Sequence, residues 1–129
     1  MRSQISFEFI SGVVIILFVF VVSVLLYDNF AKETLLTGEK ARQECLIVSS
    51  LISDAVVAGD KFSANLSLPY QINNNDYIIR VSNNSTVTVS YSNRLIACTI
   101  PIKNITSTTI YPSRISVNNI NNKIYLSGI

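Results

Sequence analysis

A run of nineteen consecutive uncharged residues near the N-terminus constrains this chain more than any other feature. The run covers residues 9–27 (FISGVVIILFVFVVSVLLY), and one carboxylate, Glu8, comes directly before it. A helix needs about 20 apolar residues to cross the hydrocarbon layer of a membrane. A carboxylate at the edge of such a segment is costly in lipid, so we expect Glu8 to have a partner. The run predicts a membrane-spanning helix.

The alternative for this run is a signal peptide that is removed after export. The apolar core of a signal peptide is shorter, at about 7–15 residues, and no small-x-small cleavage site follows the run cleanly. The residues after it (YDNFAKETLL) read as a continuing helix. We therefore expect a permanent span. Only Arg2 precedes the run and Lys32 follows it, so the positive-inside rule leaves the orientation open.

Length and composition limit the remaining function classes. The chain has 129 residues, a formal net charge of +2, no histidine and no tryptophan. This length has room for one membrane segment and one domain of roughly 70 residues. The basic residues form no stripe, so no nucleic-acid partner is expected. No nucleophile–base pair, metal cluster or phosphate loop is visible, so we expect neither an enzyme nor a cofactor or metal site.

Two sequence features favour an extracytoplasmic location for the residues after the run. Cys45 and Cys98 are either two buried free thiols or the halves of a disulfide, and an oxidising compartment favours the disulfide. N-x-S/T sequons are acceptors for N-glycosylation on exported proteins. Four sequons follow the run, at Asn65, Asn83, Asn84 and Asn104.

The helix is expected to continue well beyond the apolar run. No proline occurs before Pro69, so one uninterrupted helix can extend from about residue 5 to residue 57. Its second half changes character, because apolar and small residues recur there at spacings of three and four. These residues are Ala31, Leu35, Gly38, Ala41, Cys45, Val48, Ile52 and Ala55. Such a narrow stripe is typical of a helix that covers a sheet.

After residue 60 the apolar period becomes two, which indicates short strands. We expect strands at residues 76–82, 85–91 and 94–102 and near 113–118 and 123–127, with an opening strand around 65–72 that Pro69 interrupts. Asn83-Asn84 is expected to form a hairpin turn, and the segment NNINN another. The sum is a meander of about five antiparallel strands with one apolar face.

A sheet of this size needs a cover, and the helix stripe supplies one, which predicts a two-layer α+β fold. Cys45 lies on the stripe, and Cys98 lies on the apolar face of its strand with Ile96, Ile100 and Ile102. A disulfide between helix and sheet is therefore our hypothesis, worth roughly 3–4 kcal/mol by chain entropy. The predicted parts are a membrane helix over residues 4–29, an amphipathic helix over 30–60 and a β-rich head over 61–129.

The string QISFEF (Gln4 to Phe9), followed at once by a long apolar helix, resembles the N-terminus of an archaeal type IV pilin with a class III signal peptide. The resemblance implies a leader of residues 1–3 and cleavage by a prepilin peptidase between Ser3 and Gln4. Glu8 then becomes the fifth mature residue, where type IV pilins carry a glutamate. The leader is shorter and less basic than usual, and Ser3 stands where glycine is commoner. The family's lollipop layout, a long helix bearing a β-rich head, agrees with the predicted fold.

The resemblance implies a structural subunit of a surface filament. Before assembly the subunit would sit in the membrane; afterwards its helix would pack among copies of itself, through a core that includes Phe9, Val13, Ile16, Phe20 and Val24. Glu8 would pair with the α-amino group of Gln4 in a neighbouring copy and set the register, unless it serves only the helix dipole. The pilus assembly machinery is a further implied partner. The head would be extracellular, glycosylated and available for adhesion or surface contact.

A second class of function stays open from the sequence. A non-polymerising, N-terminally anchored accessory protein of a secretion, motility or cell-envelope complex would have the same anchor and head. Retention of Met1, Arg2 and Ser3 would favour that alternative, because the register contact needs a freed amine. An anchored enzyme with a β domain is a third class, and no chemistry in the sequence supports it.

Overall fold

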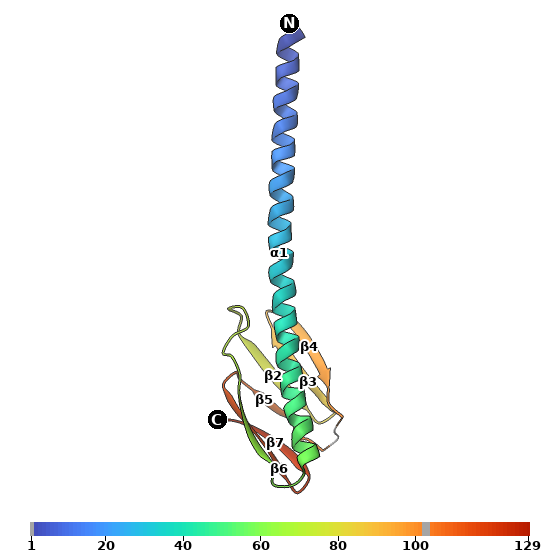
Figure 1. Ribbon diagram of the computed structural model, residues 1–129, viewed down its shortest axis with the longest axis vertical. Helices are drawn as coiled ribbons and strands as arrows, with labels where there is room; N and C mark the ends of the chain where they lie inside the picture. The colour runs from blue at the N-terminus through green and yellow to red at the C-terminus, as the bar shows by residue number, and fades with distance from the viewer. Residues whose placement is uncertain (1, 102–103) are drawn as a thin grey trace. The chain divides into compact units, whose positions relative to one another are not determined.

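The computed structural model describes residues 2–101 and 104–129, and the side chains of 6–101 and 104–129. Across these residues one helix is followed by seven strands (Figure 1). Their bounds are α1 (Arg2–Ala58), β1 (Ser63–Ser67), β2 (Tyr77–Ser82), β3 (Thr86–Tyr91), β4 (Arg94–Thr99), β5 (Thr108–Ile110), β6 (Arg114–Ile120) and β7 (Lys123–Gly128). The chain divides into two compact units, Met1–Leu36 and Thr37–Ile129.

The first unit consists of the N-terminal part of α1. The helix is continuous to Ala58, which confirms the predicted uninterrupted helix. The absence of proline explains this continuity, because proline would remove a backbone hydrogen bond and clash with the preceding turn. The second unit contains the rest of the helix and all the described strands.

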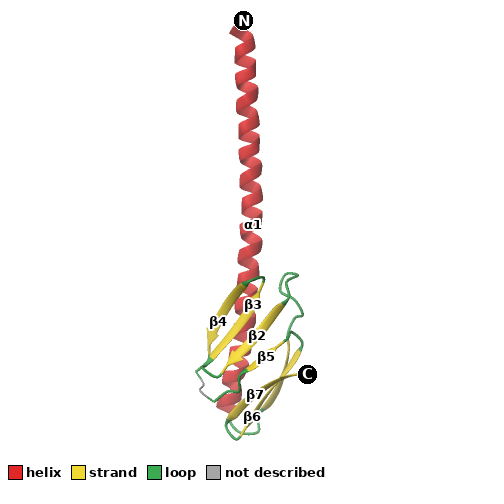
Figure 2. Ribbon diagram, turned by 180° about the vertical axis from the view of Figure 1, so that it is seen from behind, coloured by secondary structure: helices red, strands yellow, loops and turns green. Residues whose placement is uncertain are grey.

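The strands of the second unit form two antiparallel sheets (Figure 2). A three-stranded sheet has the order β1-β6-β7, and a four-stranded sheet has the order β4-β3-β2-β5. The α+β class is confirmed, but the single meander of about five strands is wrong. β1 pairs with β6 across a long sequence separation, and β5 has only three residues. Pairing between distant strands leaves no pattern in the local sequence, and three residues are too few to show a period of two. Neither feature could therefore be predicted from the sequence.

Two of the predicted strands end earlier in the structure than the sequence indicated. The opening strand, expected over residues 65–72, is β1 at Ser63–Ser67, and the chain has left the strand before Pro69. β4 ends at Thr99, before Pro101, rather than at residue 102. Ile102, which was placed on its apolar face, lies outside the described residues.

The turns follow the asparagine signals only in part. Residues 83–85 connect β2 to β3, and the positive φ of 66° falls on Ser85 instead of on the asparagine pair. In the segment NNINN, the first two asparagines belong to β6, and only Asn121 and Asn122 form the turn, with φ of 53° and 61°. Two successive positive φ values suit a type I′ turn, which matches the twist of a hairpin.

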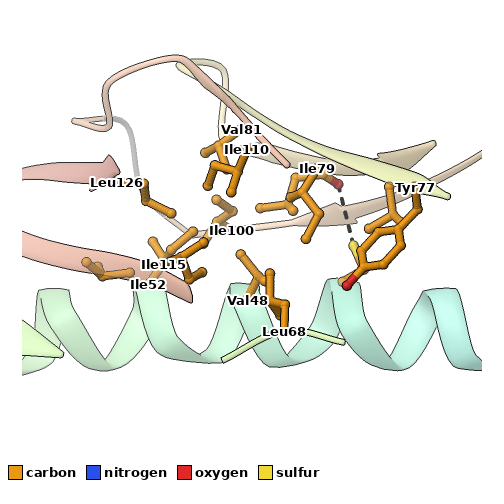
Figure 3. Close-up of a cluster of buried hydrophobic side chains, with 14 of the residues drawn as sticks. Val48, Ile52, Leu68, Tyr77, Ile79, Val81, Ile100, Ile110, Ile115 and Leu126 are labelled. Atoms are coloured by element: carbon orange, nitrogen blue, oxygen red, sulfur yellow. Dashed lines mark hydrogen bonds between the residues drawn. The ribbon is translucent and has the colours of Figure 1, made fainter. Parts of the chain in front are cut away.

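The core of the second unit lies between the helix and both sheets. Five residues on one side of the helix are fully buried: Ala41, Cys45, Val48, Ile52 and Ala55. They form one cluster with the inward side chains of the strands, and Figure 3 shows Val48 and Ile52 projecting from the helix toward them. The predicted stripe is thus confirmed from Gly38 onward. The stripe was also predicted to include Ala31 and Leu35, and this part of the prediction is wrong. Both residues lie in the first unit, where Leu35 is 72% exposed.

The C-terminal end of α1 is held by hydrogen bonds from β6 and its turn. The buried Asn119 donates from Nδ2 to the carbonyl oxygen of Ala55 at 2.8 Å. Gly59 then adopts a φ of 83°, which ends the helix as a left-handed C-cap residue does. Asp60 accepts a hydrogen bond from the backbone N–H of Asn121 at 2.6 Å. These contacts fix the helix end to the three-stranded sheet.

Candidate functional site

The apolar surface of the first unit is the main candidate for function. Its side chains over residues 9–27 point outward around the whole helix, and the most apolar 18-residue window of α1 is 0% buried. The helix is long and apolar enough to cross a membrane. A helix that is hydrophobic all round needs an apolar environment on every side. The first unit is therefore a candidate membrane anchor.

The five residues predicted for a filament core are all exposed in the chain. They follow one another at spacings of four, three, four and four, so they lie along one side of the helix. Their exposed fractions are 72% for Phe9, 40% for Val13, 70% for Ile16, 65% for Phe20 and 49% for Val24. The other sides of the helix are equally apolar. The structure thus shows an apolar cylinder, with no feature that singles out this side.

Hydroxyl side chains within the first unit bond to the helix itself. Ser11 donates from Oγ to the Glu8 carbonyl at 2.9 Å, Ser23 to the Val19 carbonyl at 2.7 Å, and Thr34 to the Phe30 carbonyl at 3.0 Å. A hydroxyl in hydrocarbon is costly unless it is hydrogen-bonded, and these bonds supply the partner within the helix. The sequence reasoning missed this feature, although serine and threonine in an apolar helix commonly bond three or four residues back.

Glu8 lies at the start of this apolar surface. Its side chain is exposed and has no ion-pair partner among the side chains that the structure describes. Ser3 and Gln4 belong to α1, but their side chains lie outside the described residues. Cleavage between them, and a contact of Glu8 with Gln4 of another copy, stay predictions.

Charge returns one residue after the apolar run, but apolar exposure continues. Lys32 and Asp28 form an ion pair at 3.5 Å, one helical turn apart, with both side chains solvent-exposed. Phe30, between these two charged residues, is 78% exposed, and Leu36, beyond them, is 60% exposed. Exposed pairs of this kind contribute little to stability. The apolar surface therefore extends to the end of the first unit.

The two cysteines are joined in a disulfide, as hypothesised, and the alternative of two free thiols is wrong. Cys45 is fully buried on α1, and Cys98 is half-buried on β4, with their Cα atoms 6.1 Å apart. Among the described strands, β4 is an edge strand whose one partner is β3. The disulfide thus ties an edge of the four-stranded sheet to the helix.

All four sequon asparagines lie in the second unit and are exposed. Asn65 is on β1, while Asn83 and Asn84 lie in the turn between β2 and β3. Asn104 donates from Nδ2 to the carbonyl oxygen of Asn122 at 3.5 Å. Each asparagine is therefore reachable from solvent, as a glycosylation acceptor must be. Their glycosylation stays a prediction.

Two titratable groups of the second unit have shifted pKa values. Burial raises the pKa of Tyr77, and the nearby Glu44 carboxylate raises it further. Tyr77 donates its hydroxyl hydrogen to the carbonyl oxygen of Pro69 at 2.6 Å, so the neutral phenol is the form that the fold uses. Burial also raises the pKa of Glu44. Tyr77 therefore contributes to the packed core in its neutral form, whereas the fold disfavours the ionised form of Glu44.

The described residues contain no group of three or more His, Cys, Asp or Glu side chains placed to hold a metal ion. What they do offer is an exposed apolar helix surface in the first unit and a disulfide-linked β-rich fold in the second. The apolar helix surface and the β-rich fold are therefore the two features of the molecule that bear on its function. Comparisons of the chain with protein-family models, with curated proteins and with solved structures find no match.

Proposed function

We propose that this chain is a structural subunit of an archaeal type IV pilus-like surface filament. It assembles through the apolar surface of its N-terminal helix and exposes its β-rich second unit for adhesion or surface contact. The observation that carries the proposal is that the side chains over residues 9–27 are apolar and exposed around the whole helix. Such a surface is stable either in lipid or among other apolar helices.

In the proposed function the helix is in lipid before assembly and among other apolar helices after it. Before assembly, residues 9–27 lie in the membrane, where the internal hydroxyl bonds of Ser11 and Ser23 lower the cost of insertion. On assembly, helices of neighbouring copies replace the lipid. An apolar cylinder allows this exchange because it presents a contact surface in every direction. A repeated head-to-tail contact that does not close produces a helical filament.

The N-terminal context gives this exchange a defined register. The string QISFEF matches the family pattern in which a prepilin peptidase frees the amine of a residue such as Gln4. Glu8 has an exposed carboxylate without an ion-pair partner among the described side chains. A buried pair between this carboxylate and the freed amine of a neighbour would be costly to break, so it selects one stagger of the helices.

The second unit suits exposure outside the cell. Its disulfide persists in oxidising compartments, and its four exposed sequons are available to a glycosylation system. In the proposal it forms the outer surface of the filament, with the prepilin peptidase and the pilus assembly machinery as transient partners.

N-terminal sequencing of the protein from its native envelope tests the processing step. We expect a start at Gln4 in material recovered from filaments. A start at Met1 in all fractions would contradict the proposal and favour a non-polymerising anchored accessory protein, because no free amine would then exist at the register position.

A substitution at Glu8 tests the assembly step separately from membrane insertion. Glu8→Gln keeps the size of the side chain and removes its charge, so we expect normal membrane content and a strong loss of filaments by electron microscopy. Glu39→Gln, at an exposed position on the same helix, is the matched control. Wild-type filament numbers in Glu8→Gln would exclude the register role.

A further inference from the structure

The charges of this chain are separated along the sequence. Residues 61–129 contain six lysines and arginines and one carboxylate, Asp76, which gives a formal charge of +5. Residues 1–60 contain four basic and seven acidic residues, a formal charge of −3. The small net charge of the whole chain hides this separation. The strands therefore carry an excess positive charge, which attracts anions from solution.

One of these cations stands in a polar setting on the four-stranded sheet. β2 alternates so that Tyr77, Ile79 and Val81 are buried while Arg80 is exposed. β2 lies between β3 and β5 (Figure 2). In the register of these strands, Arg80 is opposite Thr88 on one side and Thr109 on the other. Arg80 thus projects from the middle of the sheet, on the face away from the core, among hydroxyl side chains.

A polar hollow of about 430 Å³ lies beside Arg80. Its lining consists of Arg80, Val81, Ser82, Ser107, Thr108 and Thr109. No carboxylate is present in this lining, and the Arg80 guanidinium has no ion-pair partner among the residues that the structure describes. Within the same residues, the hydroxyls of Ser82, Ser107 and Thr109 donate no hydrogen bond. A cation and three unused donors therefore surround one open space.

We propose that this hollow binds an oxyanionic group, a sulfate or a carboxylate, of an acidic polysaccharide. The planar guanidinium of Arg80 supplies two parallel charge-assisted donors to such a group. The hydroxyls of Ser82, Ser107 and Thr109 donate to its remaining oxygens. The lining offers a cation and hydroxyls but no aromatic ring on which a base could stack, so it recognises the charged group alone. An acidic polysaccharide presents such groups repeatedly and has no bases to accommodate, which favours it over a single-stranded nucleic acid. The site lies within one chain and does not depend on filament assembly.

Binding to the full chain in a non-ionic detergent tests this site. The probes are dextran sulfate, polygalacturonate, uncharged dextran and single-stranded DNA, at low salt because charge attraction is screened. We expect binding to dextran sulfate or to polygalacturonate, and the polymer that binds more tightly identifies the oxyanion. No binding to either acidic polysaccharide would overturn the proposal. Tighter binding to DNA than to both would assign the site to nucleic acid instead.

Arg80→Gln separates this site from general charge attraction. It removes the charge-assisted donors, and we expect the affinity to fall by about tenfold. Arg114→Gln, on β6 of the other sheet, makes the same change of charge at an exposed position and should weaken binding by about twofold or less. Equal losses in the two variants would mean diffuse attraction and would overturn the site.

Thr109→Val tests the hydroxyl cradle, because it removes one donor and keeps the shape of the side chain. We expect a loss of affinity of about threefold, with an unchanged thermal unfolding midpoint. Thr99→Val is the control on an exposed position of β4, where no loss is expected. Wild-type affinity in Thr109→Val would show that this hydroxyl does not contact the anion, contrary to the proposed site.

Discussion

The two halves of the one helix differ in how their apolar side chains are removed from water. In both halves apolar side chains must leave water. Over residues 9–27 the apolar side chains surround the helix and none of the most apolar window is buried by the chain. Over residues 37–58 they form one stripe, and the sheets bury that stripe completely at Ala41, Cys45, Val48, Ile52 and Ala55.

The two halves of the helix find their apolar partners in different places. The second half has its partner within the chain, in the strands that follow it. The first half has none within its own unit, so its partner must come from outside, as lipid or as other helices. A substitution in the second half should therefore act on the stability of the fold. A substitution in the first half should act on the proposed membrane insertion and filament assembly.

Val19→Asp should have the largest effect and should leave the second unit folded. Val19 lies in the middle of the apolar run and is 57% exposed. An aspartate at the centre of a membrane helix costs about 2.5–3.5 kcal/mol, and in the proposed filament every subunit would carry such a cost. We expect no filaments by electron microscopy, with Val19→Leu as the control that keeps them. Filaments of normal number in Val19→Asp would contradict the conclusion that the first half of the helix needs apolar surroundings on every side.

Loss of the disulfide should have the next largest effect, on the second half alone. Cys45 and Cys98 are separated by 53 residues, and removing a cross-link of this span costs about 4 kcal/mol by chain entropy. The double variant Cys45→Ser/Cys98→Ser leaves no unpaired thiol. We expect a lower urea midpoint for the near-ultraviolet tyrosine signal, and unchanged membrane insertion. An unchanged midpoint would show that the link to β4 does not stabilise the fold.

One substitution made in both halves tests the comparison directly. Ile52→Ala removes a fully buried side chain and should cost about 2–5 kcal/mol of unfolding free energy. Ile16→Ala makes the same chemical change where the side chain is 70% exposed, and should cost less than about 0.5 kcal/mol in detergent. Urea unfolding of the full chain measures both. Similar losses of unfolding free energy in the two variants would contradict the conclusion that the chain buries the second half of the helix and leaves the first half exposed.

The sequence predicted the parts of this fold that depend on local signals. The continuous helix follows from the absence of proline, and the β2–β3 hairpin follows from strict alternation. The disulfide was also predicted, because each cysteine lies on an apolar side of its element. The apolar candidate surface was visible at once as an uncharged run.

The remaining features depend on pairing between distant segments. The helix stripe continues in sequence to Ala31 and Leu35, and periodicity alone cannot tell where a covering sheet stops. The split into two sheets needs the β1–β6 pairing, and the hollow beside Arg80 needs the short strand β5. The internal hydroxyl bonds of Ser11 and Ser23 were in principle readable from their place in an apolar helix.

Asn119→Ala should have a moderate effect that is again confined to the second half. Its side chain donates to the Ala55 carbonyl at the buried end of the helix, and loss of that donor should cost about 1–3 kcal/mol. Asn118→Ala, on the neighbouring and less buried position of β6, is the control, with an expected cost below about 1 kcal/mol. Hydrogen exchange of the last helical turn should rise only in Asn119→Ala. Equal exchange in the two variants would show that this bond does not hold the helix end.

Glu44→Gln should have the smallest effect, one that depends on pH. Burial raises the pKa of Glu44 in the folded chain above its ordinary value. The fold therefore favours the protonated carboxyl: its contribution to stability is present below the unfolded pKa and is lost as pH rises through the folded pKa. Because the side chain is only half-buried, Glu44→Gln should stabilise the fold by at most about 0.5 kcal/mol near pH 7, and by nothing near pH 4.

The same variant should act on Tyr77, since the Glu44 carboxylate contributes to the raised pKa of that phenol. A spectroscopic titration should find the Tyr77 pKa lower in Glu44→Gln than in the wild type, although still raised by burial. Glu39→Gln, five residues earlier on the helix and exposed, should leave this titration unchanged. A shift in Glu39→Gln as large as in Glu44→Gln would mean that the second half of the helix acts on the sheet through its overall charge. A shift confined to Glu44→Gln would mean that it acts through the charge of Glu44 itself, which raises the pKa of Tyr77.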